Sequence, residues 1–215
     1  MKQRDLFLKS EGNAWLKRNA GTVGSRKLPQ SDSLLMELLS LPLSGKGTKV
    51  LEIGCGDGTR LHWLNKQRGY DCYGVDPSAQ AVKVAKQRGV TARQGTADQL
   101  PFGNLQFDLV MFGFCLYLCD REDLFRIACE ADRVLRNPGW LLLLDFYSPV
   151  PVKRAYHHRS GLFSYKMDYR TLFTWNPAYV NVSHRVRHHS QSDYTDDPSE
   201  WVATSVLRKN LELLD

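Results

Sequence analysis

The sequence lacks several features that would place it in other protein classes. It has no C-x-x-C pair of cysteines and no apolar run of the roughly 18 to 20 residues that span a bilayer. Its five cysteines are odd in number, so buried free thiols are expected rather than a disulfide framework. The start of the chain has no apolar signal-peptide region. We therefore expect a soluble cytoplasmic protein with no metal site and no membrane segment.

Length and charge set further limits. The 215 residues are 42% hydrophobic, which is enough for one core but short for two independent domains. The net charge of +6 is unevenly spread, because Lys153 to Arg187 holds seven lysines and arginines and only one carboxylate, Asp168. Such a cluster favours an anionic acceptor or, at the extreme, nucleic acid. A solvated basic face is the equally plain alternative.

The pattern of apolar residues predicts alternating strands and helices after residue 49. Helices are predicted before it, at 5–20 and 31–41. Strands that alternate with helices imply a parallel sheet covered on both faces, with ligands at the carboxyl ends of the strands. The predicted strands are 49–53, 71–75, 91–93, 107–112 and 140–146, followed by an antiparallel pair at 179–186 and 201–207; predicted helices lie at 60–68, from 76 onward, and from 120 to a stop at 137–139.

These elements predict an α/β fold: a Rossmann-like, doubly wound, mostly parallel seven-stranded sheet with an antiparallel C-terminal edge strand. We expect residues 1–48 to form an N-terminal helical cap of the same domain. Residues 49–215 are then the ligand-binding domain, with an insertion on the acceptor side at about 147–178.

The most informative segment is a predicted strand that runs directly into alternate glycines, Gly54, Gly56 and Gly58. Glycine allows the backbone to turn sharply and a ligand to approach closely, so a nucleotide is expected on this loop. The dinucleotide fingerprint needs a glycine where this chain has Thr59. In addition, Glu52 would repel a pyrophosphate but could face a cation. The segment therefore argues against a nicotinamide dinucleotide.

The segment from Glu52 to Gly58 resembles the first motif of the class I S-adenosylmethionine-dependent methyltransferases, an acid followed by G-x-G-x-G. In that family an acid at the end of the second strand binds the ribose hydroxyls, and Asp76 stands there. Gly95 to Phe102 is similar to the family's G-D-A-x-x-L-P-F, which surrounds the adenine, although Thr96 replaces the usual Asp. The likeness extends from Val50 to Phe146.

The resemblance implies that the cofactor is S-adenosylmethionine and its product S-adenosylhomocysteine. In the N-terminal helix, Trp15 and Arg18 are three residues apart and share a face, which family members often use to close the cofactor pocket. Ordinary docking of Trp15 to the core is the alternative. The expected cofactor-binding residues are Trp15, Arg18, Glu52, Gly54, Cys55, Gly56, Gly58, Asp76, Pro77, Thr96, Ala97, Asp98 and Phe114.

The acceptor side is predicted from segments that follow the fourth and fifth strands. Tyr117 is a candidate to orient an acceptor or contact the sulfonium region, unless it packs on the sheet edge. His157 and His158 are candidates for a base, because neutral imidazole is available near pH 7, with Arg159 as an anion clamp. A paired surface His-His is the alternative.

The expected function is transfer of a methyl group to an O or N atom of a small acceptor that is anionic or contains a sugar or aromatic ring. An RNA or protein methyltransferase is one alternative, although the basic residues are few for a long phosphate track. A cofactor-binding protein without turnover is the other.

Overall fold

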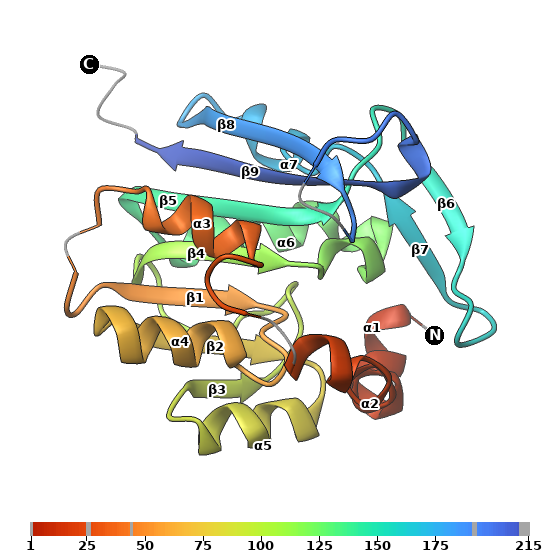
Figure 1. Ribbon diagram of the computed structural model, residues 1–215, viewed down its shortest axis with the longest axis horizontal. Helices are drawn as coiled ribbons and strands as arrows, with labels where there is room; N and C mark the ends of the chain where they lie inside the picture. The colour runs from red at the N-terminus through yellow and green to blue at the C-terminus, as the bar shows by residue number, and fades with distance from the viewer. Residues whose placement is uncertain (1, 25–26, 44, 191–192, 211–215) are drawn as a thin grey trace.

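The computed structural model (Figure 1) describes residues 2–24, 27–43, 45–190 and 193–210. Its main sheet has seven strands in the order β3-β2-β1-β4-β5-β9-β8, and a smaller sheet pairs β6 with β7. Within the described ranges, no helix has the length and apolar character to traverse a bilayer. The strands are β1 (Lys49–Ile53), β2 (Asp71–Asp76), β3 (Thr91–Gln94), β4 (Phe107–Gly113), β5 (Leu135–Phe146), β6 (Val152–Ala155), β7 (Phe163–Lys166), β8 (Tyr179–His188) and β9 (Trp201–Lys209).

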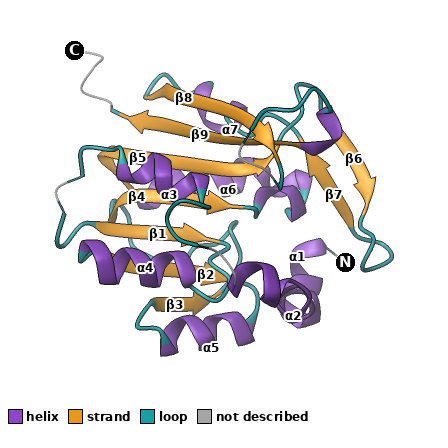
Figure 2. Cartoon of the chain, in the orientation of Figure 1, coloured by secondary structure: helices purple, strands orange, loops and turns teal. Residues whose placement is uncertain are grey.

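Helices surround the main sheet and extend from its carboxyl edge (Figure 2). At the N-terminus, two α-helical segments flank the π-helical turn η1. The helices are α1 (Gln3–Leu6), η1 (Phe7–Glu11), α2 (Gly12–Gly24), α3 (Ser33–Leu39), α4 (Thr59–Arg68), α5 (Ala79–Gln87), α6 (Leu124–Val134) and α7 (Thr171–Thr174), with short 3-10 turns η2 (Leu116–Leu118), η3 (Arg121–Asp123) and η4 (Pro198–Glu200).

The strand directions confirm the predicted doubly wound fold. Strands β3, β2, β1, β4 and β5 run parallel, and β9 runs antiparallel to both β5 and β8. The C-terminal strand is thus antiparallel as predicted, and it lies between β5 and β8, so that β8 forms the edge itself. The reason lies in composition: β9 is buried along most of its length, whereas most of β8 is exposed or half-buried. The more apolar strand takes the interior place.

Alternation along the central strands builds two cores, one on each face of the sheet. Leu51 of β1 packs with α6 and α7, whereas its neighbour Val50 packs with α3, α4 and α5. The same alternation holds in β4, where Val110 and Leu109 point to opposite cores. Both faces of the parallel sheet are therefore covered by helices.

One predicted boundary differs. Helix α6 ends at Val134 rather than at residues 137–139, because Leu135 is already extended and pairs with Phe107. The prolyl and glycyl residues that suggested a helix stop instead lie within β5. A Cβ at Gly139 would lie 2.5 Å from the carbonyl oxygen of Arg136, so this bend in β5 requires glycine.

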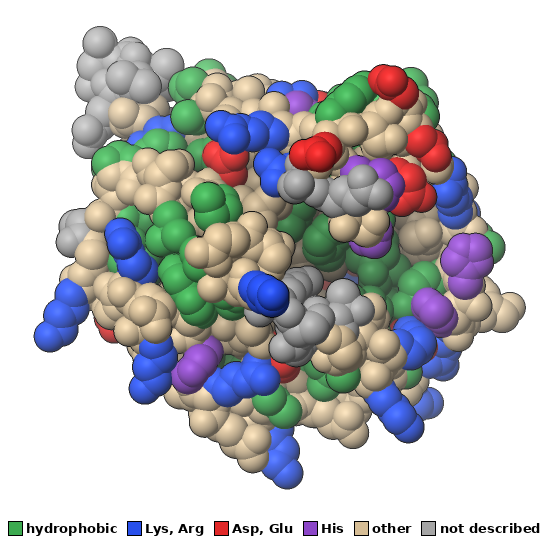
Figure 3. All heavy atoms as spheres, viewed as in Figure 1, with side chains coloured by type: hydrophobic (Ala, Val, Ile, Leu, Met, Phe, Trp, Pro, Cys, Tyr) green, Lys and Arg blue, Asp and Glu red, His purple; other side chains and the backbone are tan. Residues whose placement is uncertain are grey.

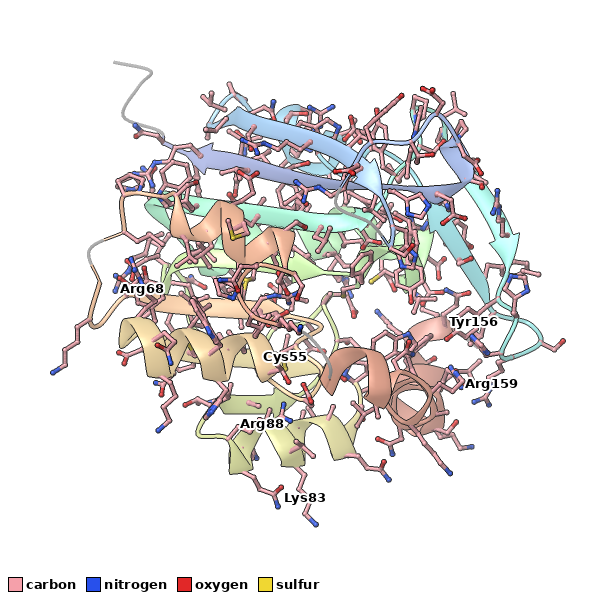
Figure 4. All side chains as sticks on the ribbon, viewed as in Figure 1. Cys55, Arg68, Lys83, Arg88, Tyr156 and Arg159 are labelled. Atoms are coloured by element: carbon pink, nitrogen blue, oxygen red, sulfur yellow. The ribbon has the colours of Figure 1, made fainter. Side chains whose placement is uncertain are left out.

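The N-terminal helix and the β6–β7 hairpin lie next to each other at the carboxyl edge of the sheet (Figure 1). The amide of Phe163 donates to Oε1 of Gln3 at 2.6 Å, and Nη2 of Arg18 donates to the hydroxyl of Tyr156 at 2.9 Å. Figure 4 labels Tyr156 and Arg159 beside α2. Buried Glu11 pairs with Arg18 and lies 3.6 Å from Nη1 of Arg159. These contacts join the two segments into one cap.

Gly58 tests the packing of the glycine segment against the helices. Its φ is +73°, and a Cβ there would lie 2.8 Å from Cβ of Ala85 in α5, which cannot rotate away. We expect Gly58→Ala to lower the free energy of unfolding by about 2–5 kcal/mol, because about 1–2 kcal/mol of left-handed strain adds to about 1–3 kcal/mol of overpacking. Gly89→Ala is the matched control, since Gly89 has a φ of +84° with open space around it. Gly89→Ala should lose only the free energy that the left-handed backbone costs an alanine. If urea unfolding showed equal losses of stability for Gly58→Ala and Gly89→Ala, the packing role of Gly58 would be contradicted.

Candidate functional site

A cavity of about 420 Å³ opens at the carboxyl ends of β1, β2, β4 and β5, beneath the N-terminal helix. On this face Figure 3 shows a hollow in which hydrophobic side chains (green) gather. The lining comes from the N-terminal helices, the loop after β1, the end of β2, the segment from Gly95 to Asp98 and the segment that follows β4, together with Phe146 and His189. This is the edge at which a doubly wound sheet binds ligands.

The loop after β1 is held by the end of β2. The amide of Gly54 donates to the carbonyl of Val75 at 2.8 Å, and the amide of Gly56 donates to Oδ2 of Asp76 at 2.8 Å. The other oxygen of Asp76 accepts from the amide of Ser78 at 2.8 Å. Burial raises the pKa of the Asp76 carboxyl to about 6, although both amides act to lower it. Asp76 thus places a buried carboxylate beside the glycine bend.

The cation that Glu52 faces is part of the protein. Buried Arg60, in the first turn of α4, donates to Oε1 of Glu52 and pairs with Asp32, whose Oδ2 lies 3.0 Å from Nη2. Asp32 also caps α3 by accepting from the amides of Leu34 and Leu35 at 3.1 Å each. Our sequence analysis missed Arg60. A cation in the first turn of a helix opposes the helix dipole, and that anomaly is a signal for a buried acidic partner.

At the opposite end of the cavity the N-terminal helix contributes a second arginine. Arg4 donates to buried Asp98 and to Oδ2 of Asp123, the latter at 3.1 Å. The amides of Gln3 and Arg4 both donate to Asp120 at 3.0 Å. The first turn of the chain is therefore tied to the side of the cavity that contains Asp98. Sequence analysis gave no signal for Arg4, because its partners lie about a hundred residues away.

The segment after β4 is organised by Asp145 at the end of β5. Oδ2 of this buried carboxylate accepts from the amide of Leu116 at 2.7 Å and from the flanking amides of Cys115 and Tyr117 at 3.1 and 3.3 Å, while Oδ1 accepts from Phe146 at 2.8 Å. Burial raises the pKa of the Asp145 carboxyl to about 7, against the effect of these four amides.

Tyr117 is oriented by this segment and by the cap. Its hydroxyl accepts a hydrogen bond from Nε1 of Trp15 at 3.1 Å, and both side chains line the cavity. Burial raises the pKa of Tyr117, which keeps the phenol protonated near pH 7. Tyr117 is therefore suited to hydrogen bonding and packing rather than to accepting a proton.

Four rings form what we call the aromatic wall of the cavity: Phe114, Tyr117, Phe146 and His189. Phe146 is central, with its ring centroid 5.0 Å from Tyr117, 5.0 Å from His189 and 5.4 Å from Phe114. The rings of Phe114 and His189 are 5.9 Å apart and nearly perpendicular, at 89°. Tilted and edge-on arrangements of this kind are the favourable ones for aromatic groups.

Comparison with known proteins identifies a methyltransferase domain in the central part of the chain. The family model for a methyltransferase domain matches residues 51–143. An uncharacterized methyltransferase of Synechocystis is 36% identical over 105 residues, which cover 48% of this chain and 49% of the relative. A demethylmenaquinone methyltransferase of Tropheryma whipplei is 30% identical over 119 residues, which cover 51% of this chain and 48% of the relative. Residues 51–143 thus match a methyltransferase domain and are similar to the class I S-adenosylmethionine-dependent methyltransferases.

Solved structures show the same fold. The 1,6-didemethyltoxoflavin-N1-methyltransferase of Burkholderia thailandensis, solved with 1,6-didemethyltoxoflavin and S-adenosylhomocysteine bound, is 16% identical with a TM-score of 0.69. The match covers 96% of this chain and 88% of that one. The chain spans about half the length of the curated relatives it matches, or somewhat less.

Most of the expected site residues of this methyltransferase domain meet in the cavity. His189 lines it too, and our sequence analysis did not single it out, because only tertiary packing brings the end of β8 to β4 and β5. The expected residues that line the cavity are Trp15, Glu52, Gly54, Cys55, Gly56, Asp76, Pro77, Thr96, Ala97, Asp98, Phe114 and Tyr117.

Four expected residues are not brought to the cavity wall. Gly58 begins α4 and packs on α5, and Arg18 points to Glu11 and Tyr156. His157 and His158 are exposed in the turn between β6 and β7, where His158 packs edge-on against Tyr156 at 5.2 Å. The turn directs both histidines away from the methyltransferase cavity, so the structure does not bring the expected base pair to it.

The charge of the cavity is opposite to that of the whole chain. Six carboxylates and two arginines line it, whereas the seven basic residues between Lys153 and Arg187 all lie outside it. No group of three histidine, cysteine or acidic side chains in the described part of the chain has an arrangement that could hold a metal.

Asp145 provides a test of how the wall is organised. Its folded pKa of about 7 lies above the unfolded value of about 3.9, so its contribution to stability is full below about pH 4 and is lost as the pH rises through about 7. Asp145→Asn retains one acceptor oxygen but leaves amides without a partner, so the free energy of unfolding should fall by about 1–3 kcal/mol at pH 5. The difference in the free energy of unfolding between Asp145→Asn and wild type, measured in urea, should be smaller at pH 8 than at pH 5. Exposed Asp196→Asn is the control, and a difference that does not change with pH would contradict the shifted pKa.

Proposed function

We propose that this chain transfers a methyl group from S-adenosylmethionine to an oxygen or nitrogen atom of a small-molecule acceptor. The observation that carries the proposal is a cavity of about 420 Å³ that is lined by the glycine bend, by Asp76 and by the aromatic wall. This volume falls in the usual range for small-molecule sites, about 300–1,000 Å³. One cavity therefore has room for a nucleoside beside a methyl acceptor.

The residues of the cavity fit the cofactor. Each oxygen of Asp76 accepts one backbone amide, which leaves lone pairs for the two ribose hydroxyls. We assign Gly54, Cys55 and Gly56 to the bend against the nucleoside, Pro77 to its edge, and Thr96, Ala97 and Asp98 to the adenine. The six carboxylates against two arginines favour a cationic ligand. When bound, S-adenosylmethionine supplies an electrophilic methyl group on a positively charged sulfur.

The N-terminal cap completes the cofactor side of the site. Trp15 lines the cavity and is held by Tyr117, so we assign it to the methionine end, where it excludes water. Arg18 acts through buried Glu11 and Tyr156 and supports the contact between the N-terminal helix and the hairpin. The proposed division is a cap at 1–48, a methyltransferase domain at 49–215 and an acceptor-side insertion at about 147–178.

The aromatic wall is the proposed acceptor side. Tyr117 presents a protonated hydroxyl that can orient an acceptor, while Phe114 and Phe146 supply flat apolar surface. Positioning alone can supply up to roughly 7–11 kcal/mol in the best intramolecular cases. The chain's main contribution is then to hold the acceptor in line and keep water out.

Asp76→Asn tests the cofactor site. Because a hydrogen bond to a charged group contributes about 1.5–3 kcal/mol, we expect the affinity for S-adenosylhomocysteine to fall about 10- to 100-fold in calorimetry. Wild-type affinity should strengthen as the pH rises through about 6, where Asp76 ionises. Exposed Asp71→Asn, on the same strand, is the matched control and should bind as wild type does.

The enzymatic part of the proposal is tested by S-adenosylhomocysteine formation across a panel of small acceptors. Product that depends on the acceptor is the expected result. A chain that binds the cofactor but forms no product with any acceptor, RNA and protein included, would instead be a binding protein without turnover. Absence of cofactor binding would overturn the whole assignment.

A further inference from the structure

His189 is the one histidine on the aromatic wall, and neither of its ring nitrogens has a hydrogen-bond partner among the residues that the structure describes. The backbone holds it in place: its amide donates to the carbonyl of Glu200 at 2.8 Å, and the amide of His188 donates to the carbonyl of Asp193 at 2.8 Å. The ring packs on Phe146 with centroids 5.0 Å apart. The ring contacts Phe146 and Phe114, but His189 as a whole is exposed, so its nitrogens remain available to a ligand.

The groups around His189 favour neutral imidazole. Burial lowers its pKa below the ordinary value of 6.5, and Lys166 and His188 lower it further, against the opposite effect of Glu200. Lys166 comes from the β6–β7 hairpin and also lies over the ring of Phe146, at 5.1 Å. Near pH 7 the ring therefore has one nitrogen that can accept a proton.

The other titratable side chains of the cavity are less suited to accepting a proton. Tyr117 is protonated, and a hydrogen bond with Cys119 together with burial raises the pKa of the Cys115 thiol. The lining carboxylates already pair with arginines or backbone amides, as Asp57 does with Arg88 at 2.7 Å. Of the titratable groups on the wall in the described chain, His189 is the one whose ring nitrogens can reach an acceptor without breaking an internal contact.

We propose that His189 accepts the proton of a hydroxyl group carried by a planar aromatic acceptor, which the aromatic wall holds by ring packing. This inference rests on the proposed methyltransferase function and specifies its substrate class. The acceptor oxygen forms a bond to the methyl carbon as that carbon's bond to sulfur breaks, leaving S-adenosylhomocysteine. The hydroxyl proton passes to the imidazole of His189 and then to solvent.

The chemistry explains why a hydroxyl on a ring is the best match. An aryl amine is already nucleophilic and needs no base, so it would leave His189 without a role. A phenol, with a pKa near that of tyrosine at about 10, is poorly nucleophilic when protonated and gains about two to four orders of magnitude from a base of suitable pKa. The flat rings of Phe146 and Phe114 favour a planar partner over an aliphatic one.

The experiment compares His189→Gln with His157→Gln, the same substitution in an exposed side chain that does not line the cavity. Matched pairs of aryl acceptors that differ only in a hydroxyl or an amino group are used with each variant. We expect His189→Gln to lose about 10²- to 10⁴-fold in kcat with the hydroxyl acceptors and less than about threefold with the amino acceptors. His157→Gln should match wild type with both.

Two readouts besides turnover accompany the comparison. S-adenosylhomocysteine binding, measured by calorimetry, should be the same in both variants and wild type, which also confirms that they fold. In the wild-type protein, NMR should show the His189 ring titrating below pH 6.5 and responding to a hydroxyaryl compound added to the S-adenosylhomocysteine complex.

The outcomes separate the two claims. If wild type turns over hydroxyaryl acceptors and His189→Gln does so equally well, or if it loses equally with amino acceptors, the role of His189 is overturned while the methyltransferase function stands. The role of His189 is also overturned if its ring titrates at the ordinary pKa and its NMR signals do not change when a hydroxyaryl compound is added. If wild type binds S-adenosylhomocysteine but turns over nothing, the proposed function fails and this inference fails with it.

Discussion

A buried carboxylate at the end of one strand accepts hydrogen bonds from the turn that follows the neighbouring strand. This interaction occurs at two places in the cavity. Asp76 ends β2 and binds the amide of Gly56 after β1. Asp145 ends β5 and binds three consecutive amides after β4. Because β2 pairs with β1 and β5 with β4, each acid acts on its immediate neighbour. The two turns so held both line the cavity, and they meet where Gly54 approaches Cys115.

The two carboxylates differ in how much hydrogen-bonding capacity they have left for a ligand. This difference distinguishes a ligand site from a structural site. Asp145 accepts four backbone amides, so its hydrogen-bonding capacity is largely used inside the protein. Asp76 accepts two and lines the cavity. Both have a raised pKa because burial disfavours the charge. For Asp76, hydroxyl donors from a ligand would offset part of that cost. Ligand binding therefore supplies the buried carboxylate with hydrogen bonds that the protein alone does not provide.

The local parts of this design were predictable from sequence and the tertiary parts were not. The bounds of β1 and the glycine bend follow from a short apolar run and its glycines, and the seven-stranded topology follows from the alternation of elements. Arg60, Arg4 and His189 escaped prediction because their partners are set by how distant elements pack. His157 was predicted at the cavity because it follows β5, but the chain continues into a hairpin whose turn points away. The order of residues in the sequence shows that a residue follows a strand, but it does not show in which direction the chain then turns.

The net charge of the whole chain does not describe the charge of the cavity. A chain of net charge +6 suggests an anionic partner, yet the cavity wall carries more carboxylates than cations. Long-range charge acts on approach through solvent and is screened within about 10 Å at 0.1 M salt, whereas groups inside a cavity act on a bound ligand with little screening. The residues that surround the ligand therefore decide what binds. A cationic cofactor can be held in an acidic cavity of a basic protein, and the basic exterior then bears on solubility and encounter rather than on the chemistry inside.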